Sequence, residues 1–347
     1  MTETINILKK LISIPSFSRE EKDVTDALQK EIELLGHAVY RKDNNLWLMS
    51  AGFDLEKPTI LLNSHIDTVK PVNGWTLDPF TPIEKDGKLF GLGSNDAGAC
   101  LVSLLEAFFI LTAKGQDYNL IFAASAEEEV SGANGIESLL QELPKIGIAI
   151  VGEPTSMQLA IAEKGLMVLD CITSGKAGHA ARNEGDNAMY KAMQDIEWFK
   201  NYKFAKISNE LGEVKMSVTM INAGTQHNVV PDACSFVVDV RSNECYSNQE
   251  LLKEIQANVQ SEVKARSTRL NSSSIDKDHA LVQKGLEIGL KTIGSPTLSD
   301  QALMPFPSLK IGPGDSARSH TADEFIYLEE IEKGIKIYVE MLDGLKI

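Results

Sequence analysis

Four short groups of acidic residues and histidines follow apolar stretches along this chain. They comprise His65 and Asp67, then Asp96, then Glu127 to Glu129, and finally Glu153. Imidazole and carboxylate groups are suitable ligands for zinc, manganese or cobalt. Mixed nitrogen and oxygen sites without thiolate are usually catalytic, so the four groups together predict a catalytic metal site.

Each group alone has a simpler explanation. An isolated His-x-Asp is usually a surface turn, and three consecutive glutamates suit the solvated N-terminus of a helix. Gly91-Leu92-Gly93 lacks the third glycine of a dinucleotide-binding loop, and no long strand leads into it. The combination of the groups therefore carries the prediction of a metal site.

The elements around these groups must bring them together. Apolar runs at 59–63, 119–124 and 148–151 predict strands, and helical spacing predicts helices at 100–114 and 136–143. Strands that alternate with helices favour an α/β fold with a mostly parallel sheet flanked by helices. Ligands gather at the carboxyl ends of the strands in such a sheet, so the four groups are expected at one edge.

Two local signals predict smaller features. Ser18 and Glu21 have the spacing of a capping box before an amphipathic helix that ends at Gly36. Asp86-Gly87 predicts a hairpin, because this dipeptide suits a two-residue turn between apolar strands.

The pattern of elements changes after residue 163. The strands expected there are 164–173, 214–221 and 234–240, and the helices are 187–200 and 249–263. The helices at 279–292 and 328–345 and the strand at 308–311 resume the first pattern. We therefore predict a catalytic domain of residues 1–162 and 276–347, with an inserted α+β domain of residues 163–275.

Composition excludes several classes of protein. The 347 residues include 49 acidic and 34 basic side chains, and the net charge of -15 disfavours nucleic acid or anionic membrane as a partner. The N-terminus has no signal peptide pattern, and no stretch of 18 or more apolar residues predicts a membrane span. The four cysteines are scattered, which favours reduced thiols and a cytoplasmic location.

The order of these motifs resembles the M20 family of metallopeptidases and deacylases. The resemblance is to the branch of acetylornithine deacetylase and succinyl-diaminopimelate desuccinylase, and it covers essentially the whole chain. Its motifs are His65-x-Asp67, Gly-x-Gly followed by Asp96, Glu128-Glu129, Gly-Glu153-Pro-Thr, a late His320, Gly178-His179, Asn228-Val-Val-Pro and Arg241. Two positions depart from the family pattern: Leu92 replaces its usual arginine, and Ala97-Gly98-Ala99 replaces Met-Lys-Gly.

The resemblance implies two divalent metal ions per chain, zinc most readily, with cobalt as a substitute. His65 and Glu153 would hold one ion, Glu129 and His320 the other, and Asp96 would bridge them. Asp67 would orient His65, and Glu128 would act as the general base. The run of three glutamates leaves this last assignment open by one residue.

The resemblance also implies that the inserted domain is a lid through which the protein forms a homodimer. His179 would donate to the reaction oxyanion from the partner subunit. Asn228, Arg241 and the backbone of Gly312 and Gly314 would bind the substrate. The alternatives are a surface histidine at 179 and a salt bridge within the lid for Arg241.

The expected reaction is hydrolysis of the amide bond of an N-acyl amino acid, most readily N-acetyl- or N-succinyl-L-ornithine in arginine biosynthesis. A succinyl-diaminopimelate desuccinylase or an N-acyl-lysine deacylase is the alternative. A dicarboxylic acyl group would need a further cation, for which Lys164, Arg182 and Arg318 are available. A non-catalytic dimeric binding protein is the alternative from another class, and the complete ligand set argues against it.

Overall fold

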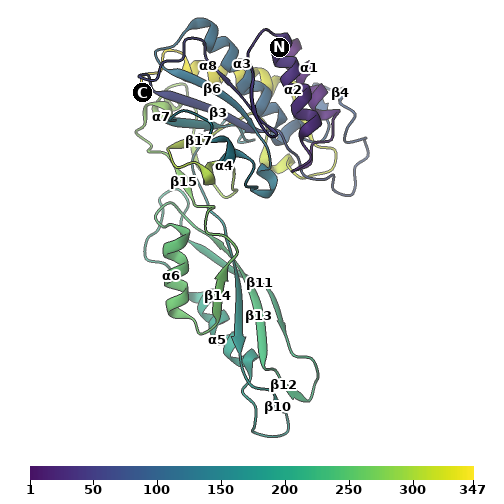
Figure 1. Cartoon of the computed structure of the whole chain (residues 1–347), viewed down its shortest axis with the longest axis vertical. Helices are drawn as coiled ribbons and strands as arrows, with labels where there is room; N and C mark the ends of the chain where they lie inside the picture. Colours follow the sequence, from purple (N-terminus) through teal and green to yellow (C-terminus); the bar gives the residue numbers. More distant parts are fainter. The chain divides into compact units, whose positions relative to one another are not determined.

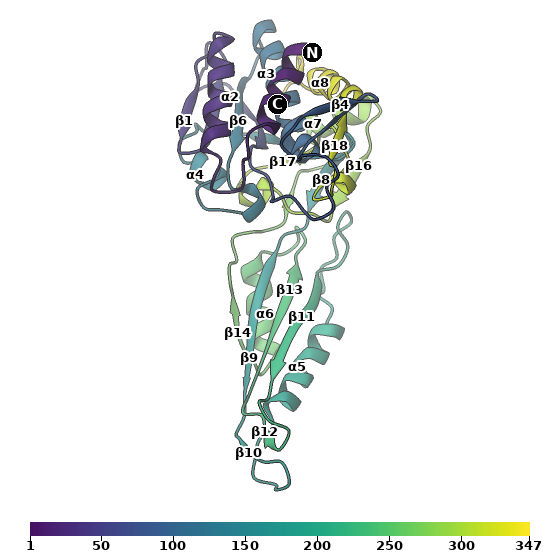
Figure 2. The same cartoon turned by 90° about the vertical axis from the view of Figure 1, so that its right-hand side faces the viewer.

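The computed structural model describes residues 1–347, and the chain divides into two compact units (Figures 1 and 2). Unit 1 comprises Met1–Ile161, Ser274–Ile293 and Ser299–Ile347. Unit 2 comprises Ala162–Ser273 and Gly294–Leu298. The inserted domain was predicted at 163–275. The grouping of residues 294–298 with unit 2 was not predicted.

A nine-stranded sheet forms the centre of unit 1. Its strands are β1 (Tyr40–Lys42), β2 (Asn45–Met49), β3 (Thr59–His65), β6 (Asn119–Ser125), β7 (Ile148–Val151), β8 (Leu159–Glu163), β15 (Ser273–Ser274), β16 (Thr292–Ser295) and β17 (Ser308–Lys310). They follow the order β1-β2-β6-β3-β7-β17-β8-β15, and β16 also pairs with β8. The inner strands β6, β3, β7 and β17 are parallel, which confirms the predicted α/β fold with a mostly parallel sheet.

Side chains of this sheet alternate between two apolar cores. Ile60 and Leu62 of β3 face the main core, whereas Leu61 faces a smaller core on the other side. The main core is covered by α1 (Thr2–Ile12), α2 (Lys22–Leu34), α3 (Ala99–Lys114), α7 (Ala280–Glu287) and α8 (Leu328–Leu342). The smaller core is covered by α4 (Ile136–Leu139) and the 3₁₀ turn η3 (Asp300–Leu303). Both faces of the sheet are therefore buried, as a parallel sheet requires.

The helical segment Ser94–Lys114 is long and apolar enough to cross a membrane by length and composition. It consists of the π-helical turn η1 (Ser94–Gly98) followed by α3. Most of it is buried within unit 1, where Leu101, Leu104 and Phe108 belong to the main core. A helix that packs on several sides inside a protein is apolar all round for this reason.

Unit 2 is built on a four-stranded antiparallel sheet of order β11-β13-β9-β14. These strands are β9 (Met167–Ser174), β11 (Lys215–Ala223), β13 (Ala233–Arg241) and β14 (Glu262–Ala265). Phe236 and Val238 of β13 pack in a core with α5 (Ala188–Asn201) and α6 (Asn248–Asn258). Figure 1 shows both helices to the left of β13 and β11. Two short strands, β10 (Gly178–His179) and β12 (Val229–Val230), pair separately.

Several predicted elements end earlier in the structure than in the sequence analysis. The helix expected at 249–263 ends at Asn258, and β14 follows it. The helix expected at 279–292 ends at Glu287, before Gly289 with φ +88°. The strands β8 and β16 and the helix α1 were not predicted. Short elements and helix ends carry few residues of periodic pattern, so neighbouring strands decide their limits.

The predicted hairpin at Asp86-Gly87 is confirmed. It joins β4 (Ile83–Lys85) to β5 (Lys88–Phe90), and both turn residues have positive φ, 54° and 73°. A turn of this kind matches the twist of the strands that flank it. A third short strand, β18 (Phe325–Tyr327), pairs with β5.

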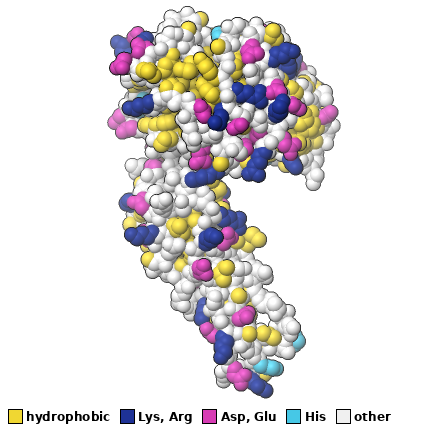
Figure 3. All heavy atoms as spheres, viewed as in Figure 1, with side chains coloured by type: hydrophobic (Ala, Val, Ile, Leu, Met, Phe, Trp, Pro, Cys, Tyr) yellow, Lys and Arg dark blue, Asp and Glu magenta, His cyan; other side chains and the backbone are white.

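Charged side chains of both signs are interspersed on the face drawn in Figure 3. This distribution fits a chain with 49 acidic and 34 basic residues. The face shown has no continuous basic surface of the kind that nucleic acid binding requires.

Candidate metal centre

The five predicted metal ligands converge at one edge of the unit 1 sheet. His65 ends β3, Glu129 lies in the short turn η2 (Glu128–Val130) after β6, and Glu153 follows β7. Asp96 comes from η1, directly before α3, and His320 precedes β18. The neighbouring parallel strands end at the same edge, which explains why residues far apart in sequence meet there.

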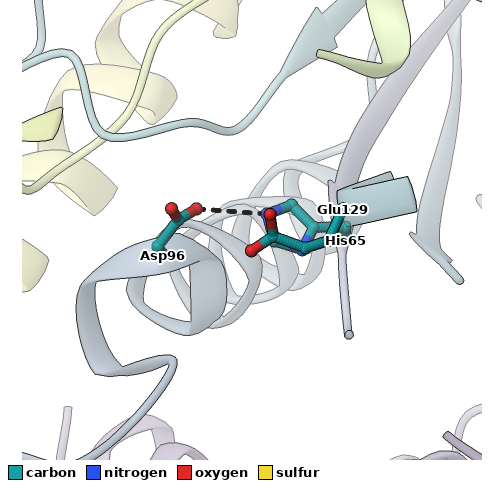
Figure 4. Close-up of side chains that lie close together, drawn as sticks. All are labelled: His65, Asp96 and Glu129. Atoms are coloured by element: carbon teal, nitrogen blue, oxygen red, sulfur yellow. Dashed lines mark hydrogen bonds and ion pairs between the residues drawn. The ribbon is translucent and has the colours of Figure 1, made fainter. Parts of the chain in front are cut away.

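Asp96 lies between the two histidines. Its Oδ1 is 3.3 Å from His65 Nε2, and its Oδ2 is 3.5 Å from His320 Nε2. Glu153 Oε1 lies 3.8 Å from His65 Nε2, and Glu129 Oε2 lies 3.1 Å from His320 Nε2. Figure 4 shows the Asp96 carboxylate directed toward the His65 ring, with Glu129 beside it. Asp96 thus presents one oxygen to each histidine, as a carboxylate bridging two ions would.

The acidic groups at this edge oppose one another electrostatically. Burial, together with the neighbouring carboxylates of Asp96 and Glu129, raises the pKa of Glu153 to about 8. Burial likewise raises the pKa of Glu128 well above its usual value. A hydrogen bond to Glu129 raises the pKa of His320 to about 9. Divalent cations would remove this repulsion, so the nitrogen and oxygen donor set fits a metal such as zinc.

Two groups of residues, which share His65, have their ligand atoms close enough together for each group to hold one metal ion. The ligand atoms of His65, Asp96 and Glu129 all lie within 4.8 Å of one another, and so do those of His65, Glu128 and Glu153. Because Glu128 belongs to the second group, its position is compatible with either a ligand or a base. The assignment of Glu128 as base and Glu129 as ligand therefore stays a prediction.

Asp67 contacts two parts of the site: its carboxylate accepts hydrogen bonds from the backbone of Glu128 and Glu129, and its backbone oxygen contacts His65. Its Oδ1 accepts the N–H of Glu128 at 3.0 Å, and its Oδ2 accepts the N–H of Glu129 at 3.1 Å and the hydroxyl of Ser18 at 2.7 Å. His65 Nδ1 lies 2.9 Å from the backbone oxygen of Asp67 and 3.6 Å from its carboxylate. The shorter contact of His65 Nδ1 is thus to the carbonyl of Asp67, and the expected orientation of His65 by the Asp67 carboxylate stays a prediction.

The predicted capping box of Ser18 and Glu21 is wrong. The helix α2 begins after Glu21 without a side-chain cap. The hydroxyl of Ser18 donates to Asp67 instead, and the buried carboxylate of Glu21 accepts the N–H of Glu127 at 3.2 Å. Both polar side chains therefore hold backbone or carboxylate groups next to the metal centre.

The predicted groups of unit 2 have partners within that unit. His179 is exposed on β10, and its Nδ1 accepts the N–H of Ala181. Asn228 precedes β12, and its carbonyl oxygen accepts the N–H of Ala180. Arg241 forms two hydrogen bonds with Asp239, at 2.8 and 3.0 Å, which is the lid salt bridge considered as the alternative. Their roles toward substrate stay predictions.

The two glycines of unit 1 lie next to the metal centre. A Cβ at Gly312 would lie 2.6 Å from the carbonyl oxygen of Glu153, so only glycine fits there. The N–H of Gly312 donates to Thr155 Oγ1 at 3.1 Å, and the expected contact of its backbone with substrate stays a prediction. Gly314 has φ +91° and its carbonyl accepts the N–H of Ser156. Gly314 stays a predicted substrate contact.

The three cations considered for a dicarboxylic acyl group are also engaged. Arg318 forms two hydrogen bonds with Glu330, at 2.6 and 3.0 Å. Arg182 lies 3.8 Å from a carboxylate oxygen of Glu184, and Lys164 donates to a backbone carbonyl at 2.9 Å. The bidentate pair makes Arg318 the least available of the three.

The departures from the family pattern lie beside the ligands. Leu92 is buried and lines a cavity of about 20 Å³ with His65 and Asp96. A Cβ at Gly98 would lie 2.5 Å from the carbonyl oxygen of Gly93, so no larger residue fits there in this backbone. The substitutions therefore leave an apolar wall behind Asp96 and leave the ligands in place.

Three buried polar residues near this edge were missed by the sequence analysis. They are Asn95, Asp300 and Glu324. Asp300 Oδ2 accepts the hydroxyl of Ser125 at 2.6 Å and the amide of Asn63 at 2.8 Å. Burial raises the pKa of Asp300 to about 6. For Asp300 the only sequence signal was a single acid between the polar residues Ser299 and Gln301, which is normally a surface feature.

Fold and site together define a metal-dependent hydrolase, because parallel strands deliver imidazole and carboxylate groups to one sheet edge. Residues 61–344 match the model of Peptidase family M20/M25/M40. The chain belongs to this family, and it is an amidohydrolase. The predicted family and enzyme class are thereby confirmed.

Curated relatives match nearly the whole chain. Acetylornithine deacetylase of Proteus mirabilis (strain HI4320) is 26% identical over 380 residues, covering 98% of this chain and 96% of that protein. Succinyl-diaminopimelate desuccinylase of Coxiella burnetii (strain Dugway 5J108-111) is 26% identical over 275 residues, covering 74% and 73%. These two relatives are named for different substrates, acetylornithine and succinyl-diaminopimelate.

The fold is shared with solved structures of the family. The crystal structure of a Bacillus subtilis protein described as a dinuclear metal binding peptidase from the M20 family aligns with a TM-score of 0.73 and 17% identity. The alignment covers 98% of this chain and 97% of that chain. At this identity the likeness shows a common fold.

Proposed function

We propose that this protein hydrolyses N-acyl amino acids and removes the acetyl or succinyl group from N-acyl-L-ornithine in arginine biosynthesis. The observation that carries the proposal is the convergence of carboxylates and imidazoles around Glu128 at one sheet edge. The similarity to an acetylornithine deacetylase over 98% of the chain supports the choice of substrate.

The proposed centre holds two divalent ions, zinc in the cell, with cobalt as a functional substitute. His65 and Glu153 would hold one ion, Glu129 and His320 would hold the other, and Asp96 would supply a carboxylate oxygen to each. When bound, the ions supply an activated water and polarise the carbonyl of the scissile amide. The dinuclear description of the Bacillus subtilis structure supports two ions rather than one.

Glu128 handles the proton in the proposed reaction. Its carboxylate accepts a proton as the water oxygen bonds to the carbonyl carbon, and it returns that proton to the amine nitrogen as the C–N bond breaks. Burial raises the pKa of Glu128, which makes its carboxylate a stronger proton acceptor. Asp67 holds the backbone N–H of Glu128 and so fixes where this side chain begins.

A second substrate has specific support. The similarity to a succinyl-diaminopimelate desuccinylase covers 74% of this chain, at the same identity as the deacetylase. Both reactions use the same centre, and the acyl-binding and amine-binding groups distinguish them.

A screen of amine release tests the proposal directly. The acetyl and succinyl forms of ornithine, lysine and diaminopimelate are each incubated with the protein and zinc or cobalt. We expect the highest kcat/KM for an N-acyl-ornithine, and no amine release after chelation. A tenfold preference for succinyl-diaminopimelate would establish the second substrate, and amine release from none of the six compounds would contradict the proposed function.

The proposed homodimer uses unit 2. Strand β11 is at the edge of its sheet, and α5 packs against it. Both expose large apolar side chains, with Tyr190, Met193, Met220 and Ile221 between 56% and 66% exposed. An unpaired edge strand beside exposed apolar residues is a surface that a second copy would cover.

A further inference from the structure

Glu324 is a buried carboxylate with no part in the proposed chemistry. It precedes β18 and is only 2% exposed. Its Oε2 accepts the N–H of Gly93 at 3.0 Å, and its Oε1 accepts the N–H groups of Asn95 at 2.8 Å and Asp96 at 2.9 Å. One side chain thus gathers three backbone N–H groups from the loop that carries the bridging ligand.

The local backbone explains why this loop needs an external acceptor. Gly93 has φ +75°, and Asp96 has φ -117° and ψ 96°, which is non-helical. N–H groups in such a turn have no regular partner along the chain, and burying them without an acceptor is strongly unfavourable. A charged carboxylate is the strongest acceptor available, so Glu324 sets the path of the backbone at Asp96.

Asn95 ties the same loop to the segment that carries His320. Its Oδ1 accepts the N–H of Asp315 at 3.0 Å, and its Nδ2 donates to the carbonyl of Asp315 at 3.1 Å and to Ser319 Oγ at 3.3 Å. A Cβ at Gly314 would lie 2.4 Å from Asn95 Oδ1, so the close approach requires glycine. The two segments therefore touch through side chain and backbone on both sides of the site.

We infer that Glu324 and Asn95 are positioning residues that hold Asp96 and His320 in place for the metal centre. Asp96 Oδ2 already lies 3.5 Å from His320 Nε2, although the two residues belong to different segments. The inference rests on the proposed metal centre and adds two residues that touch neither ion nor substrate. Residues that orient metal ligands through hydrogen bonds commonly change metal affinity 10- to 100-fold when replaced.

The chain offers a matched control in unit 2. Asp195 is also a buried carboxylate, and it accepts the backbone N–H groups of Gln260 at 3.1 Å and Ser261 at 2.7 Å. Both Glu324→Gln and Asp195→Asn remove a charge and an acceptor of buried backbone groups. Only the first acts on the loop that carries Asp96.

The experiment is a cobalt titration of the metal-free protein, followed by visible absorption and calorimetry. We expect Glu324→Gln to bind one of its two cobalt ions about 10- to 100-fold more weakly and to change the absorption bands. We expect its kcat to fall while KM stays near the parental value. Asp195→Asn is expected to lower Tm and leave the cobalt titration unchanged.

The titration tests the proposed metal centre and the positioning role of Glu324 separately. A parent protein that binds no cobalt contradicts the proposed function itself. If the parent binds two ions and Glu324→Gln reproduces its affinity and spectrum, Glu324 is only structural and the inference is overturned. Should Glu324→Gln fail to fold, Asn95→Ala undergoes the same titration, and parental affinity and spectrum in that variant overturn the inference equally.

Discussion

Glu128 and Glu129 are adjacent in the chain and have different proposed tasks. Their backbone N–H groups are held by the two oxygens of one carboxylate, Asp67, so the start of each side chain is set separately. Glu129 Oε2 lies 3.1 Å from His320 Nε2. The ligand atoms of Glu128, His65 and Glu153 lie within 4.8 Å of one another. Both side chains thus lie near His65, Glu129 also contacts His320, and mutation tests their roles.

Glu128→Gln is expected to lower kcat by about 10²–10⁴-fold with metal content near that of the parent, because a base is lost and no ligand. Glu129→Gln is expected to lose metal from one site. Steady-state kinetics combined with metal analysis of both variants makes the comparison. If Glu128→Gln loses metal and Glu129→Gln retains it, the assignment is wrong by one residue.

Asp300 makes stability depend on pH. Burial raises its pKa in the folded protein to about 6, above the ordinary value of 3.8, so the folded state holds the proton more tightly than the unfolded state. The free energy of unfolding of the metal-free protein therefore falls as pH rises from about 4 to about 6. Asp300→Asn removes this cost and is expected to be roughly 1–3 kcal/mol more stable than the parent at pH 7.

Denaturant unfolding of the metal-free parent and of Asp300→Asn between pH 4 and pH 7.5 measures this effect. The difference in free energy of unfolding is expected to shrink toward pH 4, where folded Asp300 is protonated and a large share of the unfolded group is protonated as well. A difference that stays constant with pH would contradict an ionised Asp300 as its cause.

At the scale of elements, close packing of α3 on the sheet determines where Glu153 lies. Gly152 directly follows β7 and precedes Glu153. A Cβ on Gly152 would lie 2.7 Å from Leu104 Cδ1 and 3.1 Å from Cys100 Cβ, both on α3. The helix thus approaches the strand end so closely that only glycine fits before the ligand.

Gly152→Ala is expected to destabilise the protein by about 1–3 kcal/mol, because an added methyl group meets a packed core. It should also weaken metal binding, since the strand end that carries Glu153 must shift. Gly147→Ala, just before the same strand, is the matched control: its Cβ would meet only Thr59 O, at 3.5 Å. Thermal unfolding and cobalt titration of both variants test the idea, and equal behaviour of the two would refute it.

At the scale of the molecule, the fold of unit 1 is expected to survive loss of the metal. Its main core contains large buried side chains from five helices and the sheet, and this burial does not depend on the ions. Dialysis against a chelator should therefore abolish activity and leave circular dichroism largely unchanged. Zinc or cobalt should restore activity with two ions per chain. Full activity at one ion per chain would contradict a two-ion centre.

The proposed dimer makes a separate prediction about His179. If His179 completes the site of the partner subunit, His179→Ala and Glu128→Gln should each be nearly inactive alone. Dissociation and random reassociation of an equal mixture makes half of the dimers mixed, each with one intact site of two. About a quarter of the parental activity should then return. Mixed dimers identified by mass spectrometry but without activity would rule out donation from the partner.

The sequence alone was sufficient for the family, the α/β class and the set of clustered acids and histidines. The apolar run at 59–63 placed His65 at a strand end, and Asp96 and Glu153 were recognisable because short motifs surround them. These features are local: each depends on residues within a few positions of one another, so periodicity and spacing reveal them.

Only the tertiary structure showed how the site is held. Glu324 reaches Gly93 across 231 positions, and Asp300 reaches Asn63 across 237. Ser18 and Glu21 had the spacing of a helix cap, but both side chains form hydrogen bonds with residues distant in the sequence instead. A buried polar group takes whichever partner the fold brings near, and that choice depends on packing between distant segments rather than on neighbouring residues.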